Sequence, residues 1–440
     1  MLHDPGRTRH SRERLREVIR LARTAALVLS LGACESSEEG SGLPPSAEPA
    51  EVAERSVVID GEFGAVLGLA VDRAGRIYAA DGVSQEIRIF SPAGDPVSSI
   101  GRRGRGPGEF TGLQDVAVGR GDSLFAFDPV LQRVSVYAVG DSVALAYVTD
   151  VSHRSGTRAV QSVLVPSTSG VMVQYALPFN RHNLDARREI VLRRLDGGGS
   201  VLKDSLLVVP HREFLVTRDP KYGYSVGMLP FGRRPVLRLG TDDRLYYGWS
   251  DSLVISIYSP DGGRVARVGA RRAAPPVTRR EKKVLLGSYP TRFERKLLRK
   301  ALRDGKIPST KPAFKDFLVD GQGRVWVNVV TSDDMQVSSA EGLRYVAMAD
   351  GAPARDGSPW WVIDSDGKRV ATVAFPENAT LHLIRDDEAF GVETDDLGVQ
   401  TIVRYRLPAE LGTAALVATP TGSPGSARSQ EAAEPTGGTS

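Results

Sequence analysis

The sequence contains a single cysteine, Cys34, and six histidines among its 440 residues. One thiol cannot form an intramolecular disulfide or a thiolate metal cage. The sequence also has neither a Gly-x-Ser-x-Gly nucleophile motif nor a phosphate-binding loop that ends in Lys-Ser or Lys-Thr. We therefore assign no catalytic residue, no metal ligand and no cofactor from the sequence, and we favour a protein that is not an enzyme.

The chain has a formal net charge of +4 and a pI near 9.1, and part of this positive charge lies at its N-terminus. Residues 1–33 contain seven Arg and three Asp or Glu, and 50 basic and 50 acidic residues remain without them. The global charge therefore does not indicate nucleic-acid binding, and we do not expect nucleic acid to be a partner.

The N-terminus has the three parts of a secretory signal. Its arginines precede a short apolar run, Thr24–Leu31, and small residues lead to Cys34. The run is far shorter than the roughly 20 residues of a membrane-spanning helix. Leu31-Gly32-Ala33-Cys34 resembles the bacterial lipobox, which implies that Cys34 is acylated and becomes the mature N-terminus. A buried helix with an incidental cysteine is the alternative.

These features predict a lipoprotein signal peptide over residues 1–33 and an exported protein that is lipid-anchored to the bacterial cell envelope through Cys34. Residues 34–55 are rich in Ser, Gly, Pro and Glu and are predicted to form a flexible tether. Residues 409–440, rich in Ala, Thr, Pro, Gly and Ser, are predicted to form a disordered tail.

Between these segments, residues 56–408 show short alternating strands separated by tight turns. The first unit has four of them, Leu67–Asp72, Arg76–Ala80, Glu86–Phe90 and Pro96–Ile100. The pattern returns from Asp115 and, more weakly, near Gln161, Val236, Phe317 and His382. Four-stranded units at a period of about 40–50 residues are typical of propeller blades. The fold class is therefore all-β, a single six-bladed β-propeller of four-stranded antiparallel blades.

The strand Val57–Asp60 precedes the first blade, whereas the last blade is short near Arg404–Leu407. A lone meander cannot bury both faces of its sheet, so the blades must stack and close into a ring. We therefore predict that the N-terminal strand completes the last blade and removes the two free edges.

The first two repeats also carry a family resemblance. Ile100–Phe110 followed by Asp115–Val118 looks like the linker between NHL repeats, and so does Ala79–Asp81 with Ile87–Phe90. The chain resembles the six-bladed, NHL-type propeller lipoproteins of bacteria over residues 66–137. It departs from them at Glu86, where that pattern usually has Arg. The resemblance implies an architecture and no particular ligand.

Residues 271–311 interrupt the strand pattern between blades four and five. Thr278-Arg-Arg-Glu281 and Thr291-Arg-Phe-Glu294 are capping boxes that mark two helix starts, and Gly305 fits a helix stop. We predict a short helical hairpin whose apolar residues dock on the blades.

The same stretch carries 14 Lys or Arg and three Asp or Glu. Such a surface is either a solvated helix face or a binding site for an anionic partner such as lipid headgroups, surface polysaccharide or nucleic acid. Nucleic acid fits poorly, because few aromatic residues are interleaved for base stacking. The candidate patch consists of Arg279, Arg280, Lys282, Lys283, Arg292, Arg295, Lys296, Arg299, Lys300 and Arg303.

Polar residues just before the inner strands should face the mouth of the axial tunnel. These candidate ligand-binding residues are Gln114, Asp115, Arg233, Arg234, Lys315, Asp316 and His382. Either they solvate the tunnel mouth or they bind a ligand. Some six-bladed propellers are hydrolases that hold a metal at this place, but the Arg and Lys residues here argue against a calcium cage, which needs six to eight oxygens.

The function predicted from the sequence is a non-enzymatic binding or scaffold module for proteins, peptides or glycans, held at the membrane by its acyl chains. The alternative is a propeller hydrolase or lyase with an axial divalent metal. The composition of the tunnel mouth should separate them, because three or more convergent Asp, Glu, Asn or His residues favour the enzyme.

Overall fold

The structure, a computed structural model, describes residues 55–60, 63–152, 159–166, 170–180, 182–219, 223–270, 272–289, 291–332 and 359–411. The predicted signal peptide, Cys34 and nearly all of the predicted tether and tail lie outside these residues. Two predicted boundaries are corrected. Arg55 already belongs to the first strand, and Ala409–Leu411 form a short 3₁₀ helix whose Leu411 is buried.

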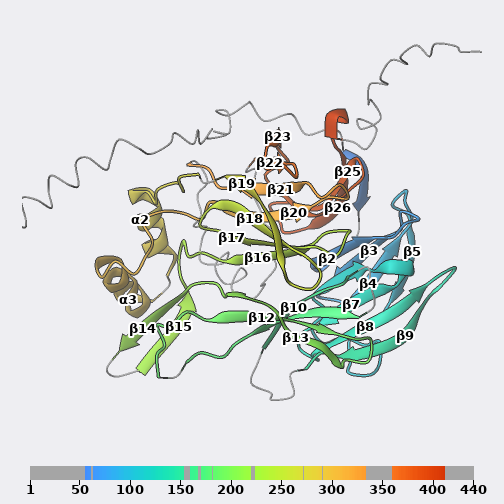
Figure 1. Cartoon of the computed structure of the whole chain (residues 1–440), viewed down its shortest axis with the longest axis horizontal. Coiled ribbons are helices and arrows are strands. Elements are labelled where there is room, and N and C mark those ends of the chain that lie inside the picture. The colour runs from blue at the N-terminus through green and yellow to red at the C-terminus, as the bar shows by residue number, and fades with distance from the viewer. Residues whose placement is uncertain are drawn as a thin grey trace, which may run out of the picture. The chain divides into compact units, whose positions relative to one another are not determined.

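Six four-stranded antiparallel sheets confirm the predicted six-bladed propeller (Figure 1). Blades one to three are β2 (Val66–Val71), β3 (Ile77–Asp81), β4 (Glu86–Phe90) and β5 (Pro96–Ile100); β6 (Asp115–Val118), β7 (Leu124–Asp128), β8 (Arg133–Val139) and β9 (Val143–Asp150); and β10 (Ala159–Leu164), β11 (Val171–Ala176), β12 (Glu189–Leu195) and β13 (Val201–Pro210). Blades four to six are β16 (Pro235–Leu239), β17 (Leu245–Trp249), β18 (Leu253–Tyr258) and β19 (Arg264–Ala270); β20 (Phe314–Val319), β21 (Val325–Val329), β22 (Trp360–Ile363) and β23 (Arg369–Val373); and β24 (Ala379–Arg385), β25 (Glu388–Thr394) and β26 (Gln400–Arg406) with β1 (Arg55–Asp60).

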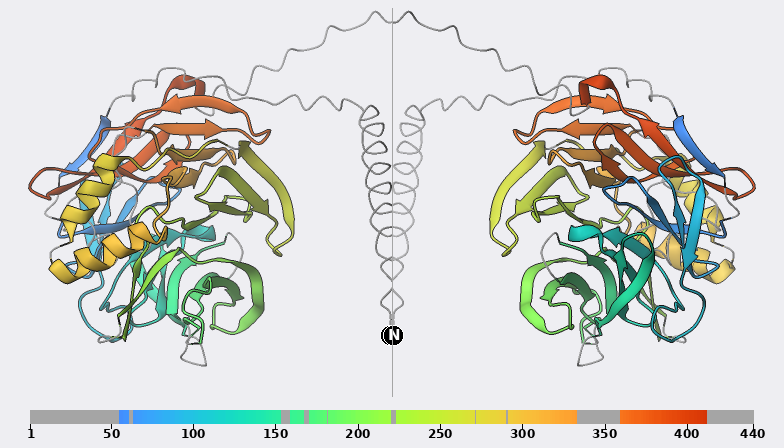
Figure 2. Two further views of the ribbon diagram at one scale, coloured as in Figure 1. Left: turned by 90° about the vertical axis from the view of Figure 1, so that its left-hand side faces the viewer. Right: turned by 90° about the vertical axis from the view of Figure 1, so that its right-hand side faces the viewer.

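The N-terminal strand closes the ring as predicted. β1 pairs antiparallel with β26, so that the last blade takes its outer strand from the other end of the chain (Figure 2). Arg55 forms an ion pair of 2.7 Å with Glu393, which also accepts a hydrogen bond of 2.6 Å from the hydroxyl of Tyr405. Ile59 is buried among side chains of blades six and one. The closing strand therefore contributes to the core as well as to the sheet.

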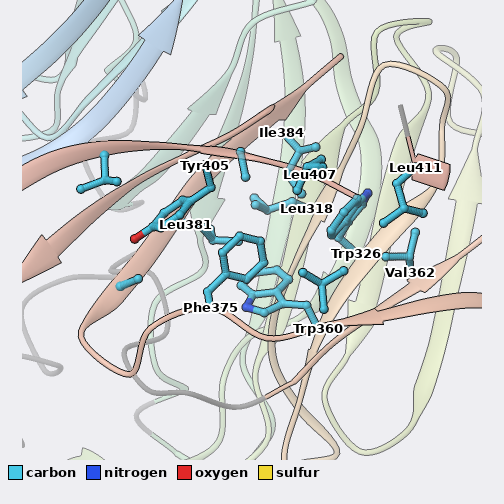
Figure 3. Close-up of a cluster of buried hydrophobic side chains, with 14 residues drawn as sticks. Leu318, Trp326, Trp360, Val362, Phe375, Leu381, Ile384, Tyr405, Leu407 and Leu411 are labelled. Atoms are coloured by element: carbon cyan, nitrogen blue, oxygen red, sulfur yellow. The ribbon is translucent and has the colours of Figure 1, made fainter. Parts of the chain in front are cut away.

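A hydrophobic cluster fills each interface between neighbouring blades. Between blades five and six, Trp326, Trp360, Phe375 and Tyr405 pack together with aliphatic side chains (Figure 3). Phe375 meets the rings of Trp360 and Tyr405 edge to face, with centroid separations of 6.4 and 5.4 Å. The core of this protein is therefore a series of side-chain layers between sheets, because each blade buries its faces only against its neighbours.

Polar side chains fix the tight turns between the first two strands of a blade. Asp72 accepts hydrogen bonds from the backbone and Nε of Arg76 and from the hydroxyl of Tyr78. In blade five, Asp320 repeats this pattern with Arg324 and with the indole N–H of Trp326. Gly75 and Gly323 occupy the same turn position, with φ of 83° and 77°, which a residue with a Cβ rarely adopts.

Because every blade is an antiparallel meander that starts at its inner strand, its connections emerge at two opposite faces. We call the face where the inner strands begin the insertion face, and the opposite one the turn face. The connections from strand one to two and from strand three to four lie on the turn face and are short. The connections from strand two to three and from blade to blade lie on the insertion face and include all the long ones.

Two insertions on this face pack against each other (Figure 1). The predicted helical hairpin is present as α2 (Arg279–Ser288) and α3 (Arg292–Arg303), and both capping boxes are formed. An unpredicted hairpin of β14 (Phe214–Asp219) and β15 (Gly223–Met228) precedes blade four. Leu298 and Ala301 of α3 are buried in a cluster with Phe231. The helices thus dock on the segment around this hairpin, whereas the sequence predicted docking on the blades.

Within the described residues, no helix is both long and apolar enough to cross a membrane.

A buried ion pair fastens the helices to blade five. The ammonium of Lys311 lies 2.9 Å from the carboxylate of Glu281, and both side chains are almost fully buried. Lys311 also donates a hydrogen bond of 3.0 Å to the carbonyl oxygen of Ser332. Burial alone would raise the pKa of Glu281, but hydrogen bonds from Thr278 and Lys311 outweigh it and lower that pKa. The carboxylate is thus held in its charged form.

Replacing Lys311 with Met should destabilise the protein by about 3 kcal/mol, because it leaves the Glu281 carboxylate buried without its cation. The double variant Lys311→Met with Glu281→Gln should lose less, since no unpaired charge remains. Lys300→Met is the matched control. It breaks an exposed 4.0 Å pair with Asp304 and should cost less than about 1 kcal/mol. Urea denaturation measures the free energy of unfolding of all three variants. Equal losses of stability in Lys311→Met and Lys300→Met would contradict the stabilising role of the buried pair.

Candidate functional site

Four of the six inner strands carry a bulge near their first residues. The register with the second strand shifts around Leu67 in β2, Gln161 in β10, Lys315 in β20 and His382 in β24. A bulge inserts one residue and re-aims its side chain, and bulges are frequent beside functional sites. The shifts in β2, β10 and β20 fall in the first half of each strand, toward the insertion face, and the shift in β24 falls at the middle of the strand.

The strongest polar contact at the axis joins blades four and five. Nη2 of Arg238 in β16 donates hydrogen bonds of 2.8 Å to both carboxylate oxygens of Asp316 in β20. The Asp316 side chain is almost fully buried, whereas Arg238 retains about a third of its exposure. The same carboxylate accepts the backbone N–H of Phe317 at 2.8 Å. Arg238 is therefore neutralised by a well-placed counterion.

Asp115 occupies the start of β6, where the residue keeps accessible surface while protein surrounds its carboxylate. Its Oδ1 accepts the backbone N–H of Val116 at 2.8 Å, which repeats the geometry of Asp316 with Phe317. Desolvation raises the pKa of Asp115 to about 6, against the opposing effects of this hydrogen bond and of the Arg238 charge. At neutral pH the carboxylate is mostly ionised.

His382 on β24 completes a group of four polar side chains from four inner strands. Burial and the positive charge of Arg238 lower its pKa to about 4, so the imidazole is neutral at neutral pH. Arg238 thus acts on Asp115 and on His382 while it is paired with Asp316. We call Asp115, Arg238, Asp316 and His382 the axial cluster.

The axial cluster includes three of the seven predicted residues and one that the sequence did not reveal to us. Arg238 lies inside a strand of otherwise apolar residues, Val236-Leu-Arg-Leu239. A charged residue in an inner strand was the sequence signal that could have identified it as an axial residue. The prediction had placed the basic residues of blade four at Arg233 and Arg234, just before the strand.

The other four predicted residues have structural contacts. Arg233 donates to the carbonyl and hydroxyl oxygens of Thr310 at 2.9 and 2.6 Å, and so joins blade four to the helical insertion. Arg234 donates to the carbonyl oxygen of Lys315, whose side chain is buried. The backbone N–H of Gln114 pairs with the carbonyl of Phe127.

The axial cluster does not fit a divalent metal ion. It offers two carboxylates, of which Asp316 is already occupied by the Arg238 guanidinium, so one carboxylate remains where a cation such as Ca²⁺ needs six to eight oxygens. Across the described residues, no three His, Cys, Asp or Glu side chains are grouped so that they could hold a metal. The arrangement instead presents one carboxylate acceptor and one neutral imidazole, which can bind hydroxyl, amide or amine donors.

The predicted basic patch is present on α2 and α3. Eight of its ten members are exposed, and Lys282 and Arg295 are half-buried. Arg295 donates a hydrogen bond of 2.8 Å to the carbonyl oxygen of Tyr289, so it also serves the turn between the helices.

Comparisons with known proteins agree with the six-bladed propeller fold. A family model described as a 6-bladed beta-propeller matches residues 66–148, which span the first two blades. Together with the pairing of the six sheets, this match identifies the chain as a six-bladed β-propeller. No curated protein matches the sequence.

Among solved structures, the chain is similar to a protein from Bacteroides fragilis NCTC 9343, at 12% identity over 82% of this chain and 98% of that one, with a TM-score of 0.47. It is also similar to the calcium-binding protein regucalcin from Agrobacterium tumefaciens, at 9% identity over 82% and 98%, with a TM-score of 0.42. Virginiamycin B lyase from Staphylococcus aureus shares 9% identity over 80% and 98%, with a TM-score of 0.38. These similarities are too distant to transfer a ligand or a reaction.

Gly68 lets the inner strand of blade one approach Asp115. A Cβ at this position would lie 2.5 Å from Oδ1 of Asp115 and 2.9 Å from its Cα. Gly68→Ala should therefore force β2 and β6 apart and destabilise the protein by about 1–3 kcal/mol. Gly287→Ala in α2 is the control, since nothing lies within 4 Å of its added methyl group, and it should be neutral or slightly stabilising. Equal urea midpoints for the two variants would contradict this account.

The raised pKa of Asp115 predicts a pH-dependent stability. Between its ordinary value of 3.8 and the folded value of about 6, the folded protein binds more protons than the unfolded chain. Stability from this group is therefore lost as pH rises through that window. Asp115→Asn keeps the acceptor for Val116 but cannot ionise, so its melting temperature should exceed that of the wild type at pH 8 and converge with it near pH 4.

The wild type must be compared with Asp115→Asn at each pH, because titration of His382 changes the stability in the opposite direction to titration of Asp115. Its pKa is lowered from 6.5 to about 4, so its contribution to stability is lost as pH falls through that range. Both proteins retain His382, so its effect cancels in the difference between their melting temperatures. A difference that stays constant from pH 4 to pH 8 would show that Asp115 does not titrate as described.

Proposed function

We propose that this protein is a non-enzymatic binding module, exported and lipid-anchored at the cell envelope, which recognises proteins, peptides or glycans with the insertion face of its propeller. The observation that carries the proposal is the concentration of long connections on this one face. A rigid ring that carries variable loops on one side suits recognition, since the scaffold fixes the loops while their sequences remain free to differ.

The insertions are built as one continuous surface over blades three to five. Lys306, after α3, lies 3.9 Å from Asp185 of the β11–β12 connection and donates to the carbonyl of Val216 in β14. The guanidinium of Arg188 stacks over Phe179 and Phe214, at 4.1 and 5.1 Å from their ring centroids. These contacts hold three separate segments in one arrangement, which lowers the entropic cost of binding a partner.

The rest of the same face presents apolar side chains to solvent. Val83, Val130 and Leu397 are 56%, 65% and 89% exposed, and each lies in the connection between the second and third strands of its blade. The Asp115 carboxylate and the neutral His382 imidazole belong to the axial cluster, on the inner strands of blades two and six. Apolar contacts around polar acceptors suit a peptide or a glycan, which offers apolar surface together with N–H or O–H donors.

The proposed location rests on the sequence of the N-terminus. Basic residues, a short apolar run and the lipobox-like Leu31–Cys34 support export and acylation, and the NHL-like linker at Ile100–Phe110 supports kinship with bacterial propeller lipoproteins. Acyl chains contribute about 0.8 kcal/mol per buried methylene, so two or more would anchor the protein stably.

A photo-crosslinking amino acid placed on each face tests the proposal in cells that produce the protein. Val130 and Leu397 probe the insertion face, and Ala93 and Asp141, both exposed in short connections of the turn face, are the matched controls. We expect discrete crosslinked adducts from the first two positions and at least about fivefold less from the controls. Adducts of equal yield from both faces, or from neither, would refute recognition by the insertion face.

The same cells test the anchor separately. The protein should fractionate with membranes, and Cys34→Ser should abolish acylation detected by mass spectrometry of the N-terminal peptide. A soluble, unacylated wild-type protein would refute the location while leaving the crosslinking result valid.

A further inference from the structure

We propose that one exposed face of α3 is a docking surface for anionic lipid headgroups, and that it holds the propeller against the membrane to which the chain is tethered. The surface consists of Arg292, Lys296, Arg299 and Arg303, which we call the basic stripe. This inference rests on the envelope location proposed above, because only a membrane-tethered propeller meets a lipid surface continually.

The helix itself creates the stripe. Its four residues are separated by four, three and four positions, which places them on a single face of an α-helix. All four are exposed, whereas Leu298 and Ala301 are buried against the hairpin region on another face. Among the described residues, none of the four forms an ion pair, in contrast to Lys300, which lies 4.0 Å from Asp304. Because Leu298 and Ala301 hold one side of α3 against the hairpin region, the basic stripe on the other side is directed toward solvent.

The stripe also has a shape that suits a headgroup. A shallow hollow of about 450 Å³ is lined by Lys296, Arg299, Leu302 and Arg303. Three cations around one apolar side chain can contact a phosphate and the glycerol or acyl carbons beside it. Phe293, which is 41% exposed, follows the first residue of the stripe and adds an aromatic side chain of the kind that enters the lipid interface.

The charges around the basic stripe also favour an anionic lipid surface. Arg279, Arg280 and Lys283 are exposed on α2, so the hairpin carries seven cations in these two groups. Within residues 34–440, the part of the chain outside 271–311 has 36 basic and 47 acidic residues. A negatively charged membrane therefore attracts the helices and repels the remainder, which gives the propeller a preferred orientation.

A lipid surface fits these observations better than the other polyanions. Nucleic-acid grooves interleave cations with aromatic residues for base stacking, and only Tyr289 and Phe293 are available in this segment. A soluble anionic polysaccharide would satisfy the charges, but it would not use the apolar floor supplied by Leu302.

The test uses the mature acylated protein, reconstituted into vesicles of phosphatidylcholine alone or with about one third phosphatidylglycerol. The chain has one natural cysteine, which acylation blocks, so an introduced cysteine can carry an environment-sensitive fluorophore. Gly287→Cys places the fluorophore on the hairpin, at an exposed site with nothing within 4 Å, and Ala93→Cys places it on the turn face. We expect fluorescence from the hairpin site to be about threefold higher on anionic vesicles at low salt, and this gain to vanish near 500 mM salt.

Two variants with equal charge loss separate the stripe from net charge. The stripe variant carries Arg292→Gln, Lys296→Gln, Arg299→Gln and Arg303→Gln. The control variant carries Lys203→Gln, Arg264→Gln, Arg267→Gln and Lys368→Gln, all exposed on outer strands or turns of blades three to five. The stripe variant should lose the gain on anionic vesicles and the control should keep it. Thermal melting of both variants checks that the fold is intact.

Several results would overturn the proposal. These are equal fluorescence on both kinds of vesicle, equal loss in the two variants, or an equal rise at the Ala93 site. Binding of the stripe to a soluble anionic polysaccharide such as polygalacturonate, without a response to vesicles, would identify a glycan surface instead. If the purified protein proves to be unacylated, the proposed location fails, but added anionic vesicles still report whether the stripe binds lipid.

Discussion

Closure of the ring is the constraint on which the rest of this structure depends. A four-stranded blade has two apolar faces and can bury them only between two neighbours, so six blades need six filled interfaces. Five interfaces join consecutive parts of the chain, but the sixth brings Ile59 and β1 against residues more than 300 positions away. Pairing of β1 with β26, reinforced by the Arg55–Glu393 ion pair, completes the last blade and covers the free edge of β26.

A closed ring also separates the contacts that stabilise the fold from the face proposed for recognition. On the turn face, Asp72 and Asp320 each bind the backbone of a short turn together with an Arg and an aromatic side chain of the same blade, which leaves little room for variation. On the insertion face, the chain leaves the ring for the 43 residues between β19 and β20 and returns without disturbing a blade. The insertion still needs its own attachment, which the buried Lys311–Glu281 pair and the Arg233–Thr310 hydrogen bonds provide.

The fold could be predicted from local signals, and the axial cluster only in part. Alternating apolar residues and turn glycines defined the blades, and two capping boxes located both helices, because these signals depend on nearby residues alone. The β14–β15 hairpin was missed, since its short strands lie between two blades and carry no repeat. Arg238 was missed for another reason. Which residue of an inner strand reaches the axis depends on register and bulges, and these are set by pairing with the second strand.

Charge is distributed so that two kinds of contact do not compete. At the axis, Arg238 is held by Asp316, so its positive charge is neutralised within the protein, and the Asp115 carboxylate and a neutral imidazole are the groups that the proposed ligand would meet. The four cations of the basic stripe have no such counterions among the described residues, and their field extends into solvent to about one Debye length, roughly 8 Å at physiological salt. A partner rich in hydrogen-bond donors and an anionic surface would therefore be attracted to different parts of the same molecule. The proposed orientation at a membrane and the proposed recognition of a ligand are therefore compatible, because neither neutralises the groups that the other needs.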